Sequence, residues 1–260
     1  MLQSDDMAFG TDNRERLAGA TVSAARLRRL LDSLAAESRF EDSSSLYLAP
    51  GDTPDPLALA ATGWALPLTE LGDAALRDDC GLVGMRCGHR GLLVAPPFPV
   101  VDTFISMDWD DGPLRRILDE DYTVGVVLVR LGRFSVAVFR GGELVEAKTD
   151  SRYVKGRHYA GGTSQLRYTR VRDGQIRRLY GKVCEEVRAR LSQPAVKLDY
   201  VALGGERFTL NGLLRDCPSL AALQPITLKR RLNIRDPKRD TLPRVAAMLS
   251  ESRVWELEFS

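Results

Sequence analysis

The chain has few cysteines and no long apolar run. No stretch approaches the roughly 18 consecutive apolar residues that a membrane-spanning helix needs, and the first six residues lack the basic and apolar regions of a signal peptide. We therefore expect a cytoplasmic protein without a membrane partner. A disulfide scaffold is not expected, and reduced thiols fit better, because only four cysteines are scattered over 260 residues: Cys80, Cys87, Cys184 and Cys217.

Common signatures of nucleotide, metal and nuclease sites are also missing. The chain has no G-x-G-x-x-G after a strand and no Walker lysine. The expected strand from Tyr122 to Leu131 carries no carboxylate, whereas two-metal nucleases need several, and Asp150 has no evident companion. Cys80, Cys87 and His89 fit no common zinc spacing and have no fourth ligand. We expect neither a metal nor a cofactor.

The net charge of +2 conceals an uneven distribution. Residues 1–121 hold 11 basic and 21 acidic side chains, whereas residues 122–260 hold 26 basic and 14 acidic ones. Positive charge is densest over residues 148–190, with 12 basic against 4 acidic side chains. Such a surface is typical of proteins that bind polyanions. A solvated helix face is the alternative explanation.

The pattern of elements predicts two domains, over residues 1–121 and 122–260. In the first, apolar residues from Thr21 to Leu34 recur at near-helical spacing, and two strand-like segments, Gly81 to Arg86 and Arg90 to Pro97, flank a turn. We expect a small acidic α+β module there. This module could bind a basic ribosomal protein, bind another protein or mimic nucleic acid, and the sequence does not choose among these functions.

The second domain is expected to be a mixed sheet with flanking helices. Three antiparallel strands come first, over Tyr122–Leu131, Arg133–Arg140 and Glu143–Lys148. Apolar residues spaced three and four apart between Ile176 and Leu191 then predict the longest helix of the chain. The remaining segments alternate strand, helix, strand and helix, with strands over Ala195–Leu203 and Pro225–Leu232 and a last helix over Lys238–Ser250.

A basic, glycine-containing segment from Lys155 to Arg170 lies between the third strand and the long helix. Gly161 and Gly162 let the backbone adopt positive φ and approach a ligand closely. Gln165 is the chemically versatile side chain at the tip of this expected loop. The basic side chains around it are candidates for binding RNA: Lys155, Arg157, His158, Arg167, Arg170, Arg172, Arg177 and Arg178.

This order of elements, with Gly162-Thr-Ser-Gln165 before the long helix, resembles the catalytic middle domain of the eukaryotic and archaeal class I release factors. Those factors carry Gly-Gly-Gln. The Gly-x-x-Gln variant resembles the actinobacterial branch of the peptidyl-tRNA hydrolases that act in ribosome-associated quality control. The resemblance covers about residues 122–260 and implies a ribonuclease-H-like fold. It also implies the large ribosomal subunit, rRNA and peptidyl-tRNA as partners.

The resemblance implies a role for each residue of the motif. Gln165 would position water and stabilise the oxyanion at the ester that joins the peptide to tRNA. Gly161 and Gly162 would let the loop enter the peptidyl-transferase centre, and Thr163 and Ser164 would order its approach. Two alternatives remain: a noncatalytic adaptor that binds the ribosome or tRNA, and a surface loop in which Thr163 or Ser164 caps the helix.

Overall fold

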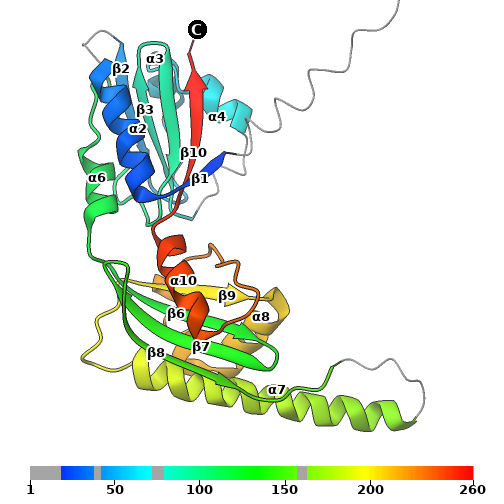
Figure 1. Cartoon of the computed structure of the whole chain (residues 1–260). Coiled ribbons are helices and arrows are strands. Elements are labelled where there is room, and N and C mark those ends of the chain that lie inside the picture. The colour runs from blue at the N-terminus through cyan, green and yellow to red at the C-terminus, as the bar shows by residue number, and fades with distance from the viewer. Residues whose placement is uncertain (1–18, 38–41, 72–78, 157–162, 260) are drawn as a thin grey trace, which may run out of the picture. The chain divides into compact units, whose positions relative to one another are not determined.

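The computed structural model describes residues 19–37, 42–71, 79–156 and 163–259, which fall into two compact units (Figure 1). Unit 1 consists of Met1–Glu120 and Ser250–Ser260, and unit 2 of Asp121–Leu249. The sequence analysis assigned residues 250–260 to the second domain. That assignment is wrong, because Ser252–Glu258 form strand β10 in the sheet of unit 1. No helix in the described part of the chain is long and apolar enough to cross a membrane.

Unit 1 contains a six-stranded sheet with the order β1-β10-β4-β3-β2-β5. Neighbouring strands are antiparallel, and β10 pairs with β4 from Arg253↔Ala95 to Glu258↔Arg90. The last strand of the chain therefore lies inside this sheet. The other strands are β1 (Ala20–Val22), β2 (Ser43–Leu48), β3 (Leu82–Cys87), β4 (Arg90–Ala95) and β5 (Phe104–Ser106).

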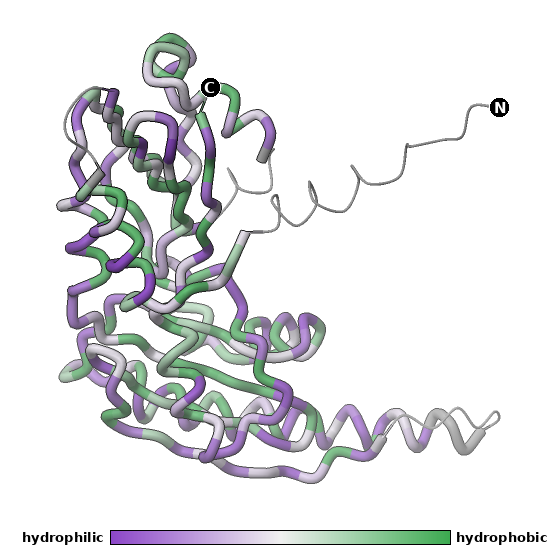
Figure 2. The backbone as a smooth tube through the Cα atoms, turned by 45° about the horizontal axis from the view of Figure 1, so that its top comes forward, coloured by the Kyte–Doolittle hydropathy of each residue, from purple (hydrophilic) through white to green (hydrophobic). Residues whose placement is uncertain are grey.

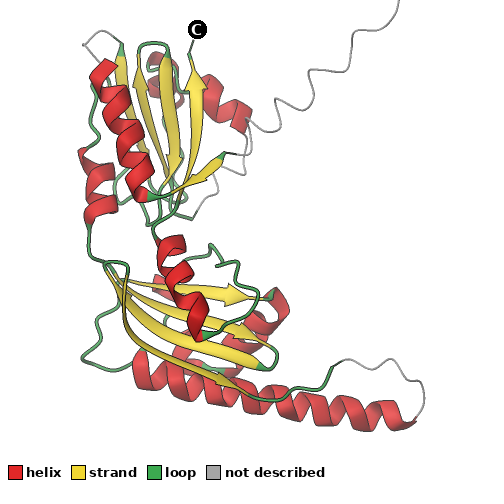
Figure 3. Ribbon diagram, in the orientation of Figure 1, coloured by secondary structure: helices red, strands yellow, loops and turns green. Residues whose placement is uncertain are grey.

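Helices cover both faces of the unit 1 sheet (Figure 3). The described helices are α2 (Ala24–Glu37), α3 (Pro56–Ala61), α4 (Ala65–Leu71) and α6 (Gly112–Asp119). Trp64 lies between α3 and α4 and packs with Leu93 and Trp255 in one apolar core. Arg115 of α6 forms an ion pair of 2.6 Å with Asp32 of α2. These observations confirm the predicted α+β module.

Unit 2 contains a four-stranded mixed sheet with the order β8-β7-β6-β9. Strands β6 (Thr123–Arg130), β7 (Arg133–Arg140) and β8 (Glu143–Ser151) are antiparallel, whereas β9 (Tyr200–Gly205) runs parallel to β6. A parallel pair needs a long crossover, which α7 (Thr163–Arg190) provides. The predicted fold class, a mixed sheet with flanking helices after an α+β module, is confirmed.

The segment predicted as a strand over Pro225–Leu232 is not a continuous strand. Two isolated parallel bridges, Val201↔Thr227 and Gly204↔Leu232, join it to β9, and a bend at Lys229 interrupts it. The spacing of apolar residues indicated that this segment is buried, but it did not indicate that the strand is interrupted. The other elements of unit 2 are α8 (Arg207–Asp216), α9 (Pro218–Ala221), α10 (Leu242–Leu249) and the 3-10 turns Gln224–Ile226 and Arg239–Thr241.

Helix α7 packs against the sheet and against α8 and α9 with the apolar stripe that its sequence predicts. Leu179, Val183 and Val187 are fully buried, and in Figure 2 hydrophilic positions recur along α7. Burial, together with the charge of Asp216, raises the pKa of Tyr180 on the same face. Packing at this face positions the whole helix.

A disulfide joins Cys184 of α7 to Cys217, which separates α8 from α9. The sequence analysis favoured reduced thiols, so that expectation is corrected for these two residues. The packing of α7 against α8 and α9 brings their Cα atoms to 5.4 Å although 33 positions separate them in the chain. This distance lies in the ordinary range for a disulfide. Cys80 and Cys87 of unit 1 are thiols.

Candidate nucleic-acid interface

Helix α7 begins at Thr163, much earlier than the apolar stripe predicted. The sequence analysis placed residues 163–170 in a loop, and the structure corrects this to helix. Thr163, Ser164 and Gln165 are therefore the first three residues of α7, although their side chains lie outside the described part of the structure. The other predicted loop residues, Arg157, His158, Gly161 and Gly162, also lie outside the described residues.

The amino-terminal part of α7 extends beyond the sheet (Figures 1 and 3). Its residues from Arg167 to Val171 are exposed, and the first buried residue of the described part of α7 is Leu179. The reason is visible in the sequence, since the apolar stripe that packs on the sheet starts only at Ile176. Residues 167–171 of α7 thus present their side chains to solvent on the projecting part of the helix.

Two hydrogen bonds fasten the segment after β8 to the side of α7. The backbone N–H of Lys155 donates to Oε1 of Gln175 at 3.0 Å, and Nε of Arg172 donates to the backbone carbonyl of Lys155 at 3.1 Å. Arg172 and Gln175 are three positions apart and therefore share one side of the helix. Val154 packs against the core of unit 2 at the same place. The chain that leads to Gly161 and Gly162 is thus held against α7.

Lys155 also contacts an aromatic ring. Its Nζ lies 5.3 Å from the ring centroid of Tyr168, a distance at which a cation and a π face attract each other. Lys155 and Arg172 are only half-exposed, so the structure gives these two predicted RNA-binding residues a structural role. The sequence analysis missed Gln175, because a lone polar residue in a helix carries no signal of its partner.

The remaining predicted RNA-binding residues in the described ranges share one face of α7. At 100° per residue they fall within about a 100° arc, opposite the buried stripe. All are exposed, and none has an ion-pair partner among the described residues. This arginine face comprises Arg167, Arg170, Arg177 and Arg178.

Basic side chains nearer the end of α7 differ from the arginine face. Lys182 pairs with Glu185 at 2.8 Å, and Arg190 pairs with Glu146 at 3.0 Å and with Glu186. Arginines without an ion-pair partner among the described residues are therefore densest between Arg167 and Arg178, in the part of the helix that follows the Gly-x-x-Gln sequence. The helix orientation adds to this, because the amino-terminal end of a helix carries partial positive charge.

Asp150 of β8 is engaged by its neighbours in the chain. Asp150 forms an ion pair with Arg152 at 3.4 Å and accepts a hydrogen bond from the backbone N–H of Ser151. Strand β6 carries no carboxylate. Across the described ranges, no group of three or more His, Cys, Asp or Glu residues is placed to hold a metal ion.

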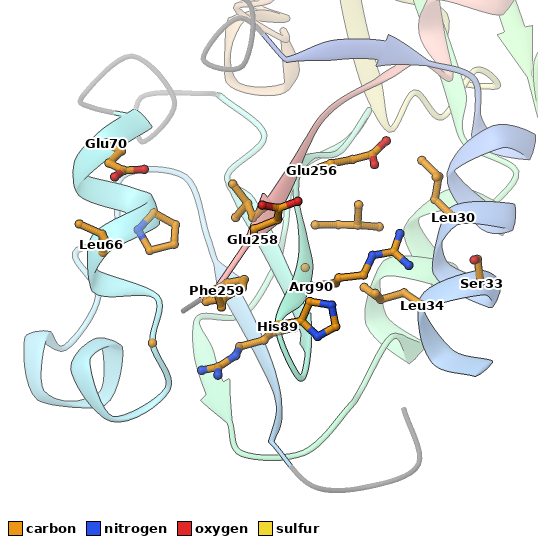
Figure 4. A pocket seen from close by; sticks show the side chains of 16 residues that line it. Leu30, Ser33, Leu34, Leu66, Glu70, His89, Arg90, Glu256, Glu258 and Phe259 are labelled. Atoms are coloured by element: carbon orange, nitrogen blue, oxygen red, sulfur yellow. The ribbon is translucent and has the colours of Figure 1, made fainter. Parts of the chain in front are cut away.

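Unit 1 has a separate groove of about 880 Å³ that lies around the end of β10 (Figure 4). Leu30 and Leu34 line it from α2, and Glu70 lines it from α4. Acidic and nitrogen-bearing side chains line it together: Glu70, Glu256 and Glu258 with Arg86, His89 and Arg90. This mixture favours no single charge class of ligand, and no predicted site residue lies there.

Comparison with known proteins assigns the chain to a family. A family model described as "Actinobacteria/chloroflexi VLRF1 release factor" matches residues 122–255. The chain belongs to this VLRF1 release factor family. The matched segment contains the Gly-x-x-Gln sequence, the arginine face and all of unit 2 except Asp121. The predicted resemblance to release factors is thereby confirmed.

The VLRF1 family member is also similar to archaeal peptide chain release factor subunit 1. It is 28% identical to the Archaeoglobus fulgidus protein over 123 residues, which are 45% of this chain and 29% of that protein. For the Aeropyrum pernix protein the identity is 27% over 96 residues, covering 36% and 26%. The match therefore spans less than a third of the length of these relatives.

Solved structures similar to this VLRF1 family member include an archaeal translation termination factor, aRF1, and Archaeoglobus fulgidus Pelota. The aRF1 structure has a TM-score of 0.36 and 18% identity, with 88% of this chain and 73% of that chain covered. For Pelota the TM-score is 0.28 and the identity 12%, with 84% and 61% covered.

Proposed function

We propose that this protein is a peptidyl-tRNA hydrolase that releases nascent chains from stalled ribosomal complexes. One observation carries the proposal: the Gly-x-x-Gln sequence of a release factor family leads into a projecting helix with an unneutralised arginine face. A projecting rod can enter a narrow RNA-lined cavity that the body of a domain cannot. The partners are the large ribosomal subunit, its rRNA and peptidyl-tRNA.

The reaction hydrolyses the ester between the nascent chain and the terminal ribose of tRNA. Because the ribosome already holds this ester, the protein needs to place a water and to stabilise the tetrahedral oxyanion. We assign this role to Gln165, with Gly161 and Gly162 allowing close approach of the backbone. Gln165 lies in the first turn of α7, where backbone N–H groups have no acceptor within the helix. Thr163 and Ser164 order this turn.

The arginine face would bind phosphate groups of rRNA or tRNA and hold α7 in place during the reaction. Arginine suits this role because its planar guanidinium can donate two parallel hydrogen bonds to a phosphate. Arg157 and His158, which lie outside the described residues, are proposed to bind the same RNA. Lys155 and Arg172 contribute indirectly, since they fasten the preceding segment to α7.

The test uses large ribosomal subunits that carry peptidyl-tRNA. Wild-type protein is expected to liberate free peptide and intact tRNA, and Gln165→Ala is expected to abolish release while binding to the subunit stays unchanged. Gln224→Ala is the matched control, because Gln224 is an exposed glutamine in a 3-10 turn outside the proposed site. Undiminished release by Gln165→Ala would remove the assignment of this residue.

The same surface would also serve a noncatalytic adaptor that only attaches to the ribosome or to tRNA. Both functions predict RNA binding that weakens with salt. They differ in the peptide-release assay. Wild-type protein that binds the loaded subunit but liberates no peptide would establish the adaptor and refute the hydrolase.

A further inference from the structure

A basic crevice lies in unit 2, and none of the described residues of α7 lines it. It has a volume of about 480 Å³ and opens where β6 ends at Arg130, where β9 ends at Gly205 and where the bridged segment passes Leu232. These three segments run parallel, so the crevice lies at their carboxyl ends. Open sheets with parallel strands commonly bind ligands at that edge.

Three arginines line this crevice: Arg130, Arg231 and Arg235. Glu206 is the carboxylate that lines it with them. None of the three arginines has an ion-pair partner within the residues that the structure describes. The carboxylate of Asp236 is already engaged by Arg133 at 2.9 Å and by Lys238 at 3.1 Å. The crevice therefore keeps an excess of positive charge.

Backbone contacts give the crevice a defined shape. Nη1 of Arg130 donates to the backbone carbonyl of Arg235 at 2.6 Å, which holds one guanidinium against the opposite wall. Gly205 has φ +138°, and a Cβ at this position would lie 2.1 Å from the carbonyl oxygen of Val129. Only glycine fits there, because any side chain would push β9 away from β6.

The first turn of α8 adds backbone donors at the edge of the crevice. This ten-residue helix begins at Arg207, directly after Gly205 and Glu206, and the side chain of Glu206 makes no capping hydrogen bond. The first N–H groups of a helix have no intrahelical acceptor, and the helix dipole favours an anion near them. Guanidinium groups and backbone amides thus converge on one small volume.

The crevice lies at the end of the sheet from which the chain proceeds to α7. Arg130 pairs with Arg133 at the end of β6, and Arg133 pairs with Ser151 at the end of β8. The following residues lead to Lys155 and the start of α7. The crevice and the Gly-x-x-Gln sequence therefore lie at the same end of unit 2. A long polyanion could contact both, so this location favours a polyanion over a small anion as the ligand of the crevice.

We infer that this crevice binds a backbone phosphate of RNA and is a second anchor besides the arginine face. The inference rests on the proposed function for the identity of the RNA, which belongs to the large subunit or to tRNA. Arginine forks and a helix amino terminus are both suited to a phosphate. Asn233, also in the lining, can donate to a ribose or a phosphate oxygen.

The test is the double variant Arg231→Ala/Arg235→Ala, with affinity measured separately for tRNA-free large subunits and for free tRNA at several salt concentrations. For the RNA that occupies the crevice, we expect affinity to fall about tenfold at moderate salt. The magnitude of the slope of log affinity against log salt should decrease by about one, because one phosphate contact is removed. The two RNAs identify the source of the phosphate.

Two further variants control for charge and for folding. Arg244→Ala removes an exposed arginine of α10 and should leave affinity and slope unchanged. Arg231→Lys/Arg235→Lys retains the charges and should keep the slope close to that of wild type. If the alanine double variant binds both RNAs with the affinity and the salt slope of the wild-type protein, the inference is overturned.

Peptide release distinguishes this inference from the proposed function. At saturating concentration the alanine double variant should release peptide like wild type, whereas Gln165→Ala binds without release. If wild-type protein releases no peptide at all, the hydrolase proposal fails. The comparison of affinities still decides whether the crevice binds RNA.

Discussion

The basic residues around the Gly-x-x-Gln sequence differ in their contacts, and among the described ones Lys155 has the most contacts to α7. Both backbone polar groups of Lys155 are bonded to side chains of α7, and its ammonium group lies over Tyr168. Exposed arginines on the opposite side of the same helix have no such partners in the described part of the chain. Basic residues that look equivalent in the sequence therefore hold the segment in place in one case and face solvent in the other.

Gln175→Ala tests the fastening of this segment. The variant removes the acceptor of the Lys155 N–H, and a net hydrogen bond contributes about 0.5–1.5 kcal/mol. We expect exchange of the Lys155 amide hydrogen to become about tenfold faster, while global stability changes little, because only a surface segment is released. NMR-detected hydrogen exchange measures this. Gln224→Ala should leave the rate unchanged, and an unchanged rate in Gln175→Ala would show that the bond does not form.

Helix α7 is one element with two different halves. Its carboxyl-terminal half is buried on the sheet and joined to the α8–α9 junction through the Cys184–Cys217 disulfide. Its amino-terminal half projects without such support. Because a helix is stiff, anchoring one half positions the other, so the packing around Leu179 and Val183 fixes where Gln165 lies relative to the sheet.

Removing the disulfide should destabilise unit 2. The bond closes a loop over a sequence separation of 33, and a disulfide of this kind typically contributes about 2–4 kcal/mol. We expect Cys184→Ala/Cys217→Ala to lower the free energy of unfolding by this amount in urea titrations followed by circular dichroism. Cys87→Ala is the matched control and should change stability by less than about 0.5 kcal/mol.

Counting thiols checks the bond directly. Denatured protein without reductant should expose two reactive thiols, those of Cys80 and Cys87, and four after reduction. Four thiols before reduction would contradict the disulfide and restore the expectation drawn from the sequence.

In the whole molecule, the chain leaves unit 1 at Glu120 and returns to it at Ser250. The returning strand β10 pairs with β1 on one side and with β4 on the other, and it buries Val254 and Trp255. Unit 1 is therefore completed only by the last residues of the chain, whereas unit 2 is formed by one continuous segment.

Truncation after Leu249 should unfold unit 1 and leave unit 2 folded. The truncated chain loses an interior strand and the Trp255 side chain from the unit 1 core. Tryptophan fluorescence reports this selectively, because Trp64 and Trp109 both lie in unit 1. We expect emission shifted to longer wavelength, and helical circular dichroism retained by residues 121–249. Native-like emission from the truncated chain would show that β10 is dispensable.

Local patterns in the sequence predicted most elements of unit 2, and one helix and two strands of unit 1. The three antiparallel strands β6, β7 and β8 and the apolar stripe of α7 depend on near neighbours, so they could be predicted without tertiary information. The start of α7 was missed because the prediction used its buried stripe, which the projecting half does not have. The broken segment from Thr227 to Leu232 was missed because burial alone does not distinguish a strand from two bridges.

The sequence by itself determined the class of fold, the resemblance to release factors and the position of the Gly-x-x-Gln motif, because these depend on residue type and local spacing. Only the tertiary structure decided which basic residues are fastened to α7, that Cys184 meets Cys217, and that β10 belongs to unit 1. It also gathered Arg130, Arg231 and Arg235 around one crevice. Each of these brings together residues far apart in the chain, and such contacts depend on packing rather than on neighbouring residues.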